Sequence, residues 1–519
     1  MNSGNPPRIP VVWTIAGTDP GGGAGIQGDL KTMQAFGVYG CSIITAVIAQ
    51  NTEGVARIEH TPLDMLESQI DALREDLPPD MVKIGVLGRS SSVQYIARAL
   101  NSIKAPIVYD PVLSSSSGAS FLEPDTLESV LDSLLPLVSL LTPNIPEAET
   151  LSGTTIRSFS DTEKAARILI DMGAGSVVIK GGHRDGDHCR DYWTDGSDHA
   201  WLTSHRLASP NTHGTGCTFS SGAASAMSLG WPMLDALVIA RAYISQGIRL
   251  APGLGHGNGP LHHGPWPAHP EDLPWISETA ENSGRTYHFP DLGKRPVGIY
   301  PIVESAEWID RLAEAGVDTV QIRIKKKINR EISAELREAI TRSRKLGIRL
   351  FVNDHWEAAI EGGAYGVHLG QDDLDPIVVE RIMNAGLRLG ISTHSFAEMS
   401  RAWNYRPSYM AIGTVYRTAS KTMNYEPLGI GTFRKLCALS PVPVVAIGGL
   451  KVENAGAVLE AGADGIAVIS DISEAGDVRK RVSEWKNLFK EHPGLKKNNA
   501  PLSRTGVGYQ DKNNGLVPR

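Results

Sequence analysis

The apolar residues of the first half of the chain fall into short continuous runs separated by amphipathic stretches. Continuous runs predict strands that are buried on both faces, and the stretches between them predict helices with one apolar side. This alternation is typical of a parallel sheet covered by helices on both faces, so an open α/β layer fold is expected over residues 10–265. The expected strands are 11–16, 43–50, 82–87, 107–110, 139–142 and 177–180, and the clearest helices are 63–73, 93–100 and 162–172.

A more regular pattern begins at Pro296. Eight β-type runs follow one another, and most are preceded by a helix that ends in a glycine turn. Eight βα units of this size predict a compact (β/α)8 TIM barrel. The expected strands are 298–303, 319–325, 349–354, 366–371, 389–393, 409–415, 443–449 and 465–470.

The stretch between these two patterns is rich in glycine and proline and has no sustained apolar period, which is typical of a linker. We therefore expect a first domain over residues 1–265, a linker over 266–295 and a barrel domain over 296–490. Residues 491–519 are polar and irregular, so disorder is expected there. They end in Leu-Val-Pro-Arg, which resembles the scar of a thrombin site from an expression vector.

Composition narrows the functional classes. The 519 residues are 41% hydrophobic and carry a net charge of −7, which argues against nucleic acid as a partner. No apolar run reaches the roughly 20 residues that span a membrane. The first residues indicate neither secretion nor organelle import, and four cysteines do not make a disulfide framework, so a cytoplasmic protein acting on small molecules is expected.

The segment 211–218 (NTHGTGCT) has the composition of an anion-binding loop at a helix start. It precedes an apolar helix, and its small residues let backbone N–H groups and the helix dipole point at a phosphate or a developing oxyanion. Cys217 lies in the first turn, where the pKa of a thiol tends to be lowered. It could act as a base or as a positioned hydrogen-bonding group, and a glycine-rich helix start with a structural cysteine is equally compatible with the pattern.

Two further motifs follow strands of the first domain. The glycine-rich segment 21–25 comes directly after the first strand, but its spacing is not that of a dinucleotide fingerprint. Asn144 and Glu147 stand three residues apart at a helix start. They could hold Mg²⁺ through water, or they could cap the helix.

Taken together, these motifs resemble the hydroxymethylpyrimidine/phosphomethylpyrimidine kinase family over about residues 10–265. The matching segments are AGTDP (16–20), GGGAG (21–25), IQGDLK (26–31), TAVIAQNT (45–52), TPNIPEA (142–148), KGGH (180–183) and NTHGTGCT (211–218). The resemblance implies a ribokinase-like three-layer α/β/α fold. It also implies ATP as co-substrate, Mg²⁺, and two successive phosphorylations that yield hydroxymethylpyrimidine diphosphate.

The resemblance also implies roles for individual residues. Gln50 would read the aminopyrimidine edge, because an amide both donates and accepts hydrogen bonds. The wider superfamily places an aspartate base where this chain has Cys217, which leaves the general base open. The implied substrate pocket is Gln50, Asp29, Gly17, Gly21 and Gly22; Mg²⁺-ATP would be served by Asn144, Glu147 and Lys180; and the catalytic set would be Asp110, Lys180, Gly214, Gly216 and Cys217, with Glu147 also a metal ligand.

Polar residues of the second half fall at the ends of the predicted barrel strands. In a barrel these ends converge on one mouth, where active sites are built. Carboxylates from two different strand ends, Asp354 and the pair Asp372 and Asp373, combine with Arg323, Lys325 and Lys421. Such a set predicts a site for a magnesium-bound diphosphate.

This pattern resembles the thiamine-phosphate synthase family over about residues 296–488. The resemblance implies that hydroxymethylpyrimidine diphosphate is joined to thiazole phosphate with release of diphosphate, through a dissociative mechanism. It assigns Mg²⁺ to Asp354 and Asp373. It assigns the diphosphate and the pyrimidine to Gln321, Arg323, Lys325, Asn353, Ser392 and Lys421, and the thiazole phosphate to Thr418, Ser420, Gly449, Ile469 and Ser470.

One alternative is a pyridoxal-type vitamin kinase fused to a thiazole tautomerase-like or non-catalytic barrel. Gln50 and the Cys217 loop oppose the first part. The full set of metal and phosphate residues opposes the second. We also expect self-association through the kinase domain, because kinases of this type are commonly dimers. A further hypothesis is that joining the two domains in one chain raises the local concentration of the intermediate that they share.

Overall fold

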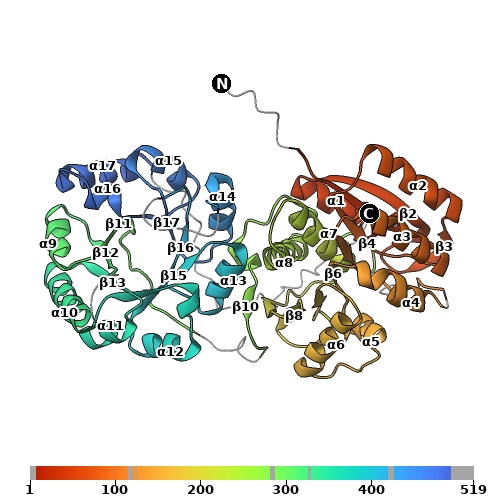
Figure 1. Cartoon of the computed structure of the whole chain (residues 1–519), viewed down its shortest axis with the longest axis horizontal. Helices are drawn as coiled ribbons and strands as arrows, with labels where there is room; N and C mark the ends of the chain where they lie inside the picture. The colour runs from red at the N-terminus through yellow and green to blue at the C-terminus, as the bar shows by residue number, and fades with distance from the viewer. Residues whose placement is uncertain are drawn as a thin grey trace, which may run out of the picture.

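The computed structural model contains two domains, coloured red to green for the first and green to blue for the second (Figure 1). The structure describes residues 8–114, 121–123, 125–280, 287–324, 329–418 and 426–492. The predicted disorder beyond residue 492 and the three predicted site residues Lys325, Ser420 and Lys421 lie outside these ranges.

The first domain is built on one ten-stranded mixed sheet. Its centre, from β2 through β1 and β4 to β7, is parallel, as continuous apolar strands require. The outer strands β3, β8, β9 and β10 run antiparallel to their neighbours and were not predicted. The strand bounds are β1 Val11–Gly17, β2 Tyr39–Gln50, β3 Val55–His60, β4 Met81–Ile84, β5 Ile107–Tyr109, β6 Leu140–Leu141, β7 Val177–Ile179, β8 His188–Thr194, β9 His199–His205 and β10 Trp275–Ser277.

Helices cover both faces of this sheet and complete a three-layer fold, which confirms the predicted architecture. Successive residues of a strand point to opposite faces, so Val12 of β1 packs into one apolar core and Trp13 into the other. The first core also contains residues of α1, α7 and α8, and the second contains residues of α2, α3 and α6. The helix bounds are α1 Gly25–Phe36, α2 Leu63–Asp76, α3 Ser90–Ile103, α4 Thr126–Ser129, α5 Ile145–Ser152, α6 Phe159–Asp171, α7 Thr215–Ser228 and α8 Met233–Arg249.

The second domain is a closed barrel of eight parallel strands in sequence order, which confirms the TIM-barrel prediction. Each predicted strand is present, and most end a few residues earlier than expected. The strands are β11 Gly298–Val303, β12 Thr319–Ile322, β13 Arg349–Asn353, β14 Gly366–Leu369, β15 Arg388–Thr393, β16 Tyr409–Gly413, β17 Val444–Ile447 and β18 Gly465–Val468. The helices are α9 Glu307–Glu314, α10 Asn329–Leu346, α11 Trp356–Gly362, α12 Pro376–Asn384, α13 Phe396–Asn404, α14 Gly429–Leu439, α15 Val452–Glu460, α16 Ser470–Ser473 and α17 Val478–Glu491.

Large aromatic rings fill part of the barrel interior, and glycine makes room for one of them. A Cβ atom on Gly390 of β15 would lie 2.2 Å from the ring of Tyr409, so only glycine fits opposite that tyrosine. Tyr409 in turn packs edge-on against Phe351 at 5.2 Å and against Tyr300 at 5.9 Å. The interior is therefore a packed core with hydroxyl groups placed at fixed points within it.

The two domains share a buried interface between α8 of the first domain and α13 of the barrel, with β10 beside them (Figure 1). β10 lies in the segment expected to be a linker, yet it pairs with β9 at the edge of the first sheet. The ring of Phe396 packs edge-on against Trp231 at 5.1 Å, and Ser400 donates a hydrogen bond of 2.7 Å to the carbonyl of Pro274.

The interface also contains a carboxylate. Asp235, in the first turn of α8, accepts hydrogen bonds from the backbone N–H groups of Phe396 and Ala397 at 2.6 and 3.1 Å. These are orphan N–H groups of the first turn of α13, so a residue of one domain caps a helix of the other. Burial raises the pKa of the Asp235 carboxyl.

Among the described residues, no helix is both long enough and apolar enough to cross a membrane.

Candidate active sites

A cavity of about 770 Å³ opens at the carboxyl ends of the parallel strands of the first domain. Such ends are where open α/β sheets bind their ligands. Nine of the predicted residues line it: Gly17, Gln50, Asp110, Asn144, Glu147, Lys180, Gly214, Gly216 and Cys217.

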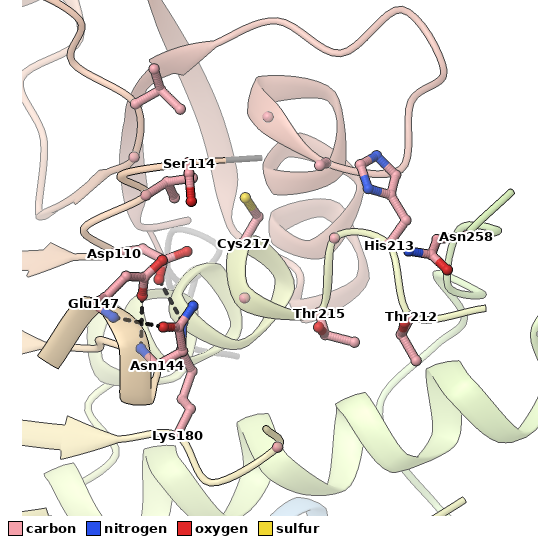
Figure 2. Close-up of a pocket in the computed structure, with 18 of the residues that line it drawn as sticks. Asp110, Ser114, Asn144, Glu147, Lys180, Thr212, His213, Thr215, Cys217 and Asn258 are labelled. Atoms are coloured by element: carbon pink, nitrogen blue, oxygen red, sulfur yellow. Dashed lines mark hydrogen bonds and ion pairs between the residues drawn. The ribbon is translucent and has the colours of Figure 1, made fainter. Parts of the chain in front are cut away.

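Three charged side chains meet on one wall of this cavity (Figure 2). Lys180, directly after β7, donates to the carboxylate of Asp110, which follows β5, at 2.6 Å. Burial opposes the charge on Lys180, but Asp110 and Glu147 outweigh it and raise the pKa of the ammonium group. Lys180 is therefore a fixed positive charge at the place where a phosphate would enter.

Glu147 and Asn144 form a reciprocal cap at the start of α5. The side chain of Asn144 accepts from the N–H of Glu147 at 2.9 Å, and the carboxylate of Glu147 accepts from the N–H of Asn144 at 2.7 Å. The capping prediction is thus confirmed. Burial, opposed by Lys180 and reinforced by Asp110, raises the pKa of Glu147 to about 7.

The start of α7 faces the same wall. A Cβ atom on Gly216 would lie 3.2 Å from Nζ of Lys180 and 3.3 Å from a carboxylate oxygen of Asp110. Gly214 has a φ of +83°, and a Cβ atom there would lie 1.8 Å from the carbonyl oxygen of Gly23. Glycine at both positions lets the backbone N–H groups at the helix start approach the cavity, which suits an anion.

Cys217 lies in the first turn of α7, but its expected low pKa is wrong. Burial raises the pKa of the thiol to about 11, and the nearby ammonium of Lys83 offsets only part of this effect. Here desolvation of the partly buried thiol outweighs the effect of the helix start. The group at neutral pH is a thiol that can donate or accept a hydrogen bond, not a thiolate.

The structure also corrects the position of Asp29. This residue does not line the cavity; it is fully buried below it and binds Lys83 at 2.8 and 3.0 Å. Thr14 and Ser221 donate further hydrogen bonds to the same carboxylate at 2.6 and 2.5 Å. Lys83 is the member of the pair that reaches the cavity wall.

Gly21 and Gly22 likewise lie outside the cavity wall, which the same loop reaches through Ala24 and Gly25. The loop is organised by Asp19, whose carboxylate accepts from the N–H groups of Gly21, Gly23 and Ala24 at 2.7 to 2.9 Å. It also lies 3.0 Å from Nε2 of His213.

Sequence reasoning therefore missed Lys83, Asp19 and His213. Lys83 could have been found from the sequence, because it stands inside the apolar run of β4. A lysine buried in this way needs a counter-charge nearby. Asp19 and His213 are 194 positions apart, and nothing local connects them.

In the barrel, the predicted residues lie at or near the carboxyl ends of several strands. Gln321 is on β12 with Arg323 just beyond it, Asn353 ends β13, and Ser392 is near the end of β15. Asp354 has a φ of +63°, a backbone conformation that aspartate seldom adopts. Burial and the carboxylate of Asp373 raise the pKa of Asp354, and Arg323 partly offsets them.

The remaining barrel residues belong to the loops after the last strands. Gly449 follows β17, and a Cβ atom there would lie 2.4 Å from the carbonyl oxygen of Arg417. Ile469 and Ser470 begin α16 directly after β18. Thr418 is the last described residue before the gap that contains Ser420 and Lys421.

Comparison with known proteins agrees with this geometry. The family model described as phosphomethylpyrimidine kinase matches residues 19–262, and the model described as thiamine monophosphate synthase matches residues 299–472. The probable thiamine biosynthetic bifunctional enzyme of Oryza sativa subsp. japonica, named as chloroplastic, is 33% identical over 493 residues, which cover 92% of this chain and 88% of that protein. The corresponding enzyme of Arabidopsis thaliana, also named as chloroplastic, is 32% identical and covers 93% and 94%. The chain belongs to the family of thiamine biosynthetic bifunctional enzymes.

Its first domain is the kinase domain and its barrel is the thiamine-phosphate synthase domain, which confirms both resemblances drawn from the sequence. The hydroxymethylpyrimidine/phosphomethylpyrimidine kinase of Bacillus subtilis is 42% identical and covers 48% of this chain and 93% of that one. A crystal structure of phosphomethylpyrimidine kinase from Clostridium difficile is 37% identical, with a TM-score of 0.42, and covers 46% and 100%.

The family's kinase reaction implies ATP as co-substrate. Within the described ranges, no group of three or more His, Cys, Asp or Glu residues could hold a metal ion unaided. The synthase domain nevertheless offers two carboxylates, and the mutual repulsion of Asp354 and Asp373 would be relieved by a divalent cation. This donor set fits a cation whose other ligands come from phosphate oxygens and water, as is usual for Mg²⁺.

A chain of hydrogen bonds crosses the synthase barrel beneath its mouth. Tyr300 and Tyr409 are 2.9 Å apart at their hydroxyl oxygens, and the hydroxyl of Tyr409 is 2.8 Å from Nδ1 of His368. Nε2 of His368 is 2.9 Å from the hydroxyl of Ser392, and the amide of Gln321 donates to Tyr300 at 3.4 Å. Burial lowers the pKa of His368 to about 4, so its ring is neutral at physiological pH.

Proposed function

We propose that the kinase domain phosphorylates hydroxymethylpyrimidine twice with ATP, and that the synthase domain couples the diphosphate to thiazole phosphate. In the first two steps, an oxygen of the substrate attacks the γ-phosphorus of ATP and ADP leaves. In the third step, the bond between the methylene carbon and the diphosphate oxygen breaks, and the thiazole nitrogen forms a new bond to that carbon. The products are thiamine phosphate and diphosphate.

The observation that carries the kinase assignment is the joint wall of Lys180, Asp110 and the start of α7. Lys180 binds the phosphoryl group being transferred, and the N–H groups at Gly214 and Gly216 bind the charge that develops on it. Fixed donors of this kind stabilise a transition state because they need no reorganisation during the reaction. The 770 Å³ cavity is large enough for the pyrimidine and the triphosphate together.

Two residues give the kinase its substrate orientation. Gln50, at the end of β2 and in the cavity lining, binds the aminopyrimidine edge. Cys217, which is protonated at neutral pH, positions the substrate hydroxyl by hydrogen bonding and does not remove its proton. Asp110 is the group nearest to Lys180 that could accept this proton.

In the synthase domain, the leaving diphosphate is bound by Arg323, Asn353 and Ser392. Gln321 binds the pyrimidine. Backbone N–H groups at Gly449 and Ser470, with the hydroxyl of Thr418, bind the thiazole phosphate. Lys325, Ser420 and Lys421, outside the described residues, complete these two groups of ligands.

Mg²⁺ would be held by Asp354 and Asp373 in the synthase domain and by Glu147 in the kinase domain. When bound, it neutralises phosphate charge. Asp354 and Asp373 themselves set the position of that charge at the barrel mouth, opposite Arg323.

The test is a reaction with purified full-length protein, hydroxymethylpyrimidine, ATP, Mg²⁺ and thiazole phosphate, in which thiamine phosphate is measured. Lys180→Met should abolish coupling from hydroxymethylpyrimidine but retain coupling from its diphosphate. Asp354→Asn should abolish coupling from both compounds, with hydroxymethylpyrimidine diphosphate accumulating because the kinase still works. If both variants lose both activities equally while remaining folded, the assignment of the two sites is wrong.

We also propose that the protein self-associates through the kinase domain and acts in the cytoplasm. Exposed Tyr39, Val47 and Met65, on β2 and α2, support the first proposal, since each is more than half exposed. Sedimentation of the wild type and of Val47→Asp tests it. None of the four cysteines, all in the described part, forms a disulfide, which suits a reducing compartment; cell fractionation tests the second proposal.

A further inference from the structure

The hydrogen-bonded chain in the synthase barrel links two predicted substrate ligands through three residues that have no assigned role. Gln321 and Ser392 stand at its two ends, and Tyr300, Tyr409 and His368 lie between them. The three are almost fully buried and come from strands β11, β16 and β14. The chain therefore crosses the barrel interior and does not follow one strand.

The barrel is shaped to hold this chain. Tyr409 fits only because the opposite residue, Gly390, has no side chain. The rings of His368 and Tyr409 are stacked, with centroids 5.7 Å apart and planes inclined by 24°. Both ring nitrogens of His368 have a partner, so the ring has no alternative orientation that would keep both bonds.

Each hydroxyl in the chain has one proton, so the sense of one hydrogen bond determines the next. The amide nitrogen of Gln321 can only donate, so the hydroxyl of Tyr300 accepts from it and donates onward to Tyr409. Tyr409 then donates to Nδ1 of His368. A neutral imidazole that accepts at Nδ1 carries its proton on Nε2, and that proton is donated to the oxygen of Ser392.

The proton of Ser392 itself is then left for a group outside the chain. If every hydrogen bond in the chain ran in the opposite direction, Ser392 would donate its proton to His368 and would present a lone pair to the barrel mouth. A lone pair would repel an anionic ligand, whereas a proton binds it with a charge-assisted hydrogen bond. An anion at the mouth therefore favours the sense that the Gln321 amide sets.

We propose that His368 is a positioning residue of the synthase, held by Tyr409 as the Nε2–H tautomer so that Ser392 donates its proton to the bound diphosphate. This proposal rests on the proposed function, which assigns Ser392 to the diphosphate. It gives the aromatic interior of the barrel a role in orienting a ligand, in addition to packing.

Tyr409→Phe tests the proposal because it removes one oxygen and keeps the ring opposite Gly390. In the full-length protein, we expect kcat/KM for hydroxymethylpyrimidine diphosphate to fall about fivefold to tenfold, the effect of one misdirected hydrogen bond. KM for thiazole phosphate and the kinase activity of the same preparation should not change. The matched control is Tyr365→Phe, which removes a hydroxyl bonded to the carbonyl of Leu292 outside the chain.

The tautomer of His368 can be measured directly, and a simple loss of packing would not change it. Long-range ¹H–¹⁵N correlation spectra of histidine-labelled protein should show His368 with a protonated Nε2 and an unprotonated Nδ1. The signal is assigned by its loss in His368→Gln. In Tyr409→Phe we expect a mixture of tautomers. His368→Gln, whose amide can still donate to Ser392, should retain more synthase activity than His368→Leu.

The outcomes distinguish this proposal from the proposed function on which it rests. If Ser392→Ala leaves the synthase unchanged, the assignment of Ser392 to the diphosphate is wrong. If Ser392→Ala impairs the synthase but Tyr409→Phe alters neither kcat/KM nor the tautomer, the positioning role of His368 is wrong. Combining both substitutions should cost no more than Ser392→Ala alone, and additive losses would also contradict the proposal.

Discussion

The carboxylate of Asp235 lies 2.6 Å from the backbone nitrogen of Phe396, 161 positions further along the chain. The two residues belong to different catalytic domains. The cap residue of α13 itself, Ser395, takes only the N–H of Glu398. Asp235 therefore satisfies the two N–H groups that α13 could not satisfy from its own sequence.

Asp235→Ala should lower the free energy of unfolding by about 2–3 kcal/mol, because it leaves two buried N–H groups without an acceptor. Urea denaturation of the full chain measures this change. Glu75→Ala, which removes an exposed acid of α2, is the control and should change stability by less than about 0.5 kcal/mol. Equal effects of the two substitutions would show that the cap across the interface contributes nothing.

Asp29→Asn should destabilise the protein by about 3–5 kcal/mol, because it leaves the ammonium group of Lys83 buried without its counter-charge. Adding Lys83→Met should recover much of the loss. Glu59→Gln, which breaks an exposed ion pair of 2.9 Å with Arg57, is the matched control and should cost less than about 1 kcal/mol. The buried pair would be shown unimportant if Asp29→Asn behaved like that control.

Cys217 should react slowly with iodoacetamide at neutral pH. Because burial raises the pKa of its thiol to about 11, the thiolate fraction below that pH rises about tenfold per pH unit. Alkylation of the Cys217 peptide, followed by mass spectrometry between pH 7 and 10, should increase without a plateau. A plateau reached by pH 10 would mean that the thiol ionises near or below its usual pKa and could serve as a base.

Glu147 should make the ligand-free kinase domain less stable as the pH rises. Burial raises its pKa from 4.5 to about 7, so the folded state holds this proton more tightly than the unfolded state does. The resulting stabilisation is complete below about pH 4.5 and is lost as the pH rises to about 7. The melting temperature of the wild type, relative to Glu147→Gln, should fall across this window; a constant difference would contradict the shift.

Gly216→Ala should reduce kinase activity by at least about tenfold while leaving synthase activity intact. Its Cβ atom would enter the space between the start of α7 and the pair Lys180–Asp110, where an atom 3.2 Å from Nζ displaces the phosphate. Gly431→Ala in α14, where a Cβ atom meets nothing within 4 Å, is the control. Steady-state assays of each half-reaction measure both, and an unimpaired Gly216→Ala kinase would exclude an anion site at this helix start.

The elements most accurately predicted are those whose signal is local. The barrel strands are mostly apolar and are bounded by turn residues, so runs such as 298–303 coincide with the strands of the structure. The antiparallel strands β8 and β9 lie near the sheet edge and mix aromatic residues with His, Arg and Asp. Their pattern follows from the neighbours they pair with, which the sequence does not display.

The site residues were also predicted well only where the signal is local in the sequence. Lys180, Asp110 and Gly216 meet as the resemblance implied, but Asp29 was assigned to the substrate although its partner Lys83 reaches the cavity. The pKa of Cys217 was predicted from its position in a helix, a local property, and the opposing effect of burial is a property of the whole fold. Prediction failed where a side chain's environment is assembled from distant segments.

The interface between α8 and α13 has a consequence for the cell. Residues of α8, including Arg241 and Ile248, line the kinase cavity, while Asp235 at the other end of the same helix holds the synthase barrel. We therefore expect a nucleotide that binds the kinase to protect the barrel from unfolding by mass action. Conversely, we expect damage to α13 to expose the kinase to proteolysis and so to lower the cellular amounts of both activities together.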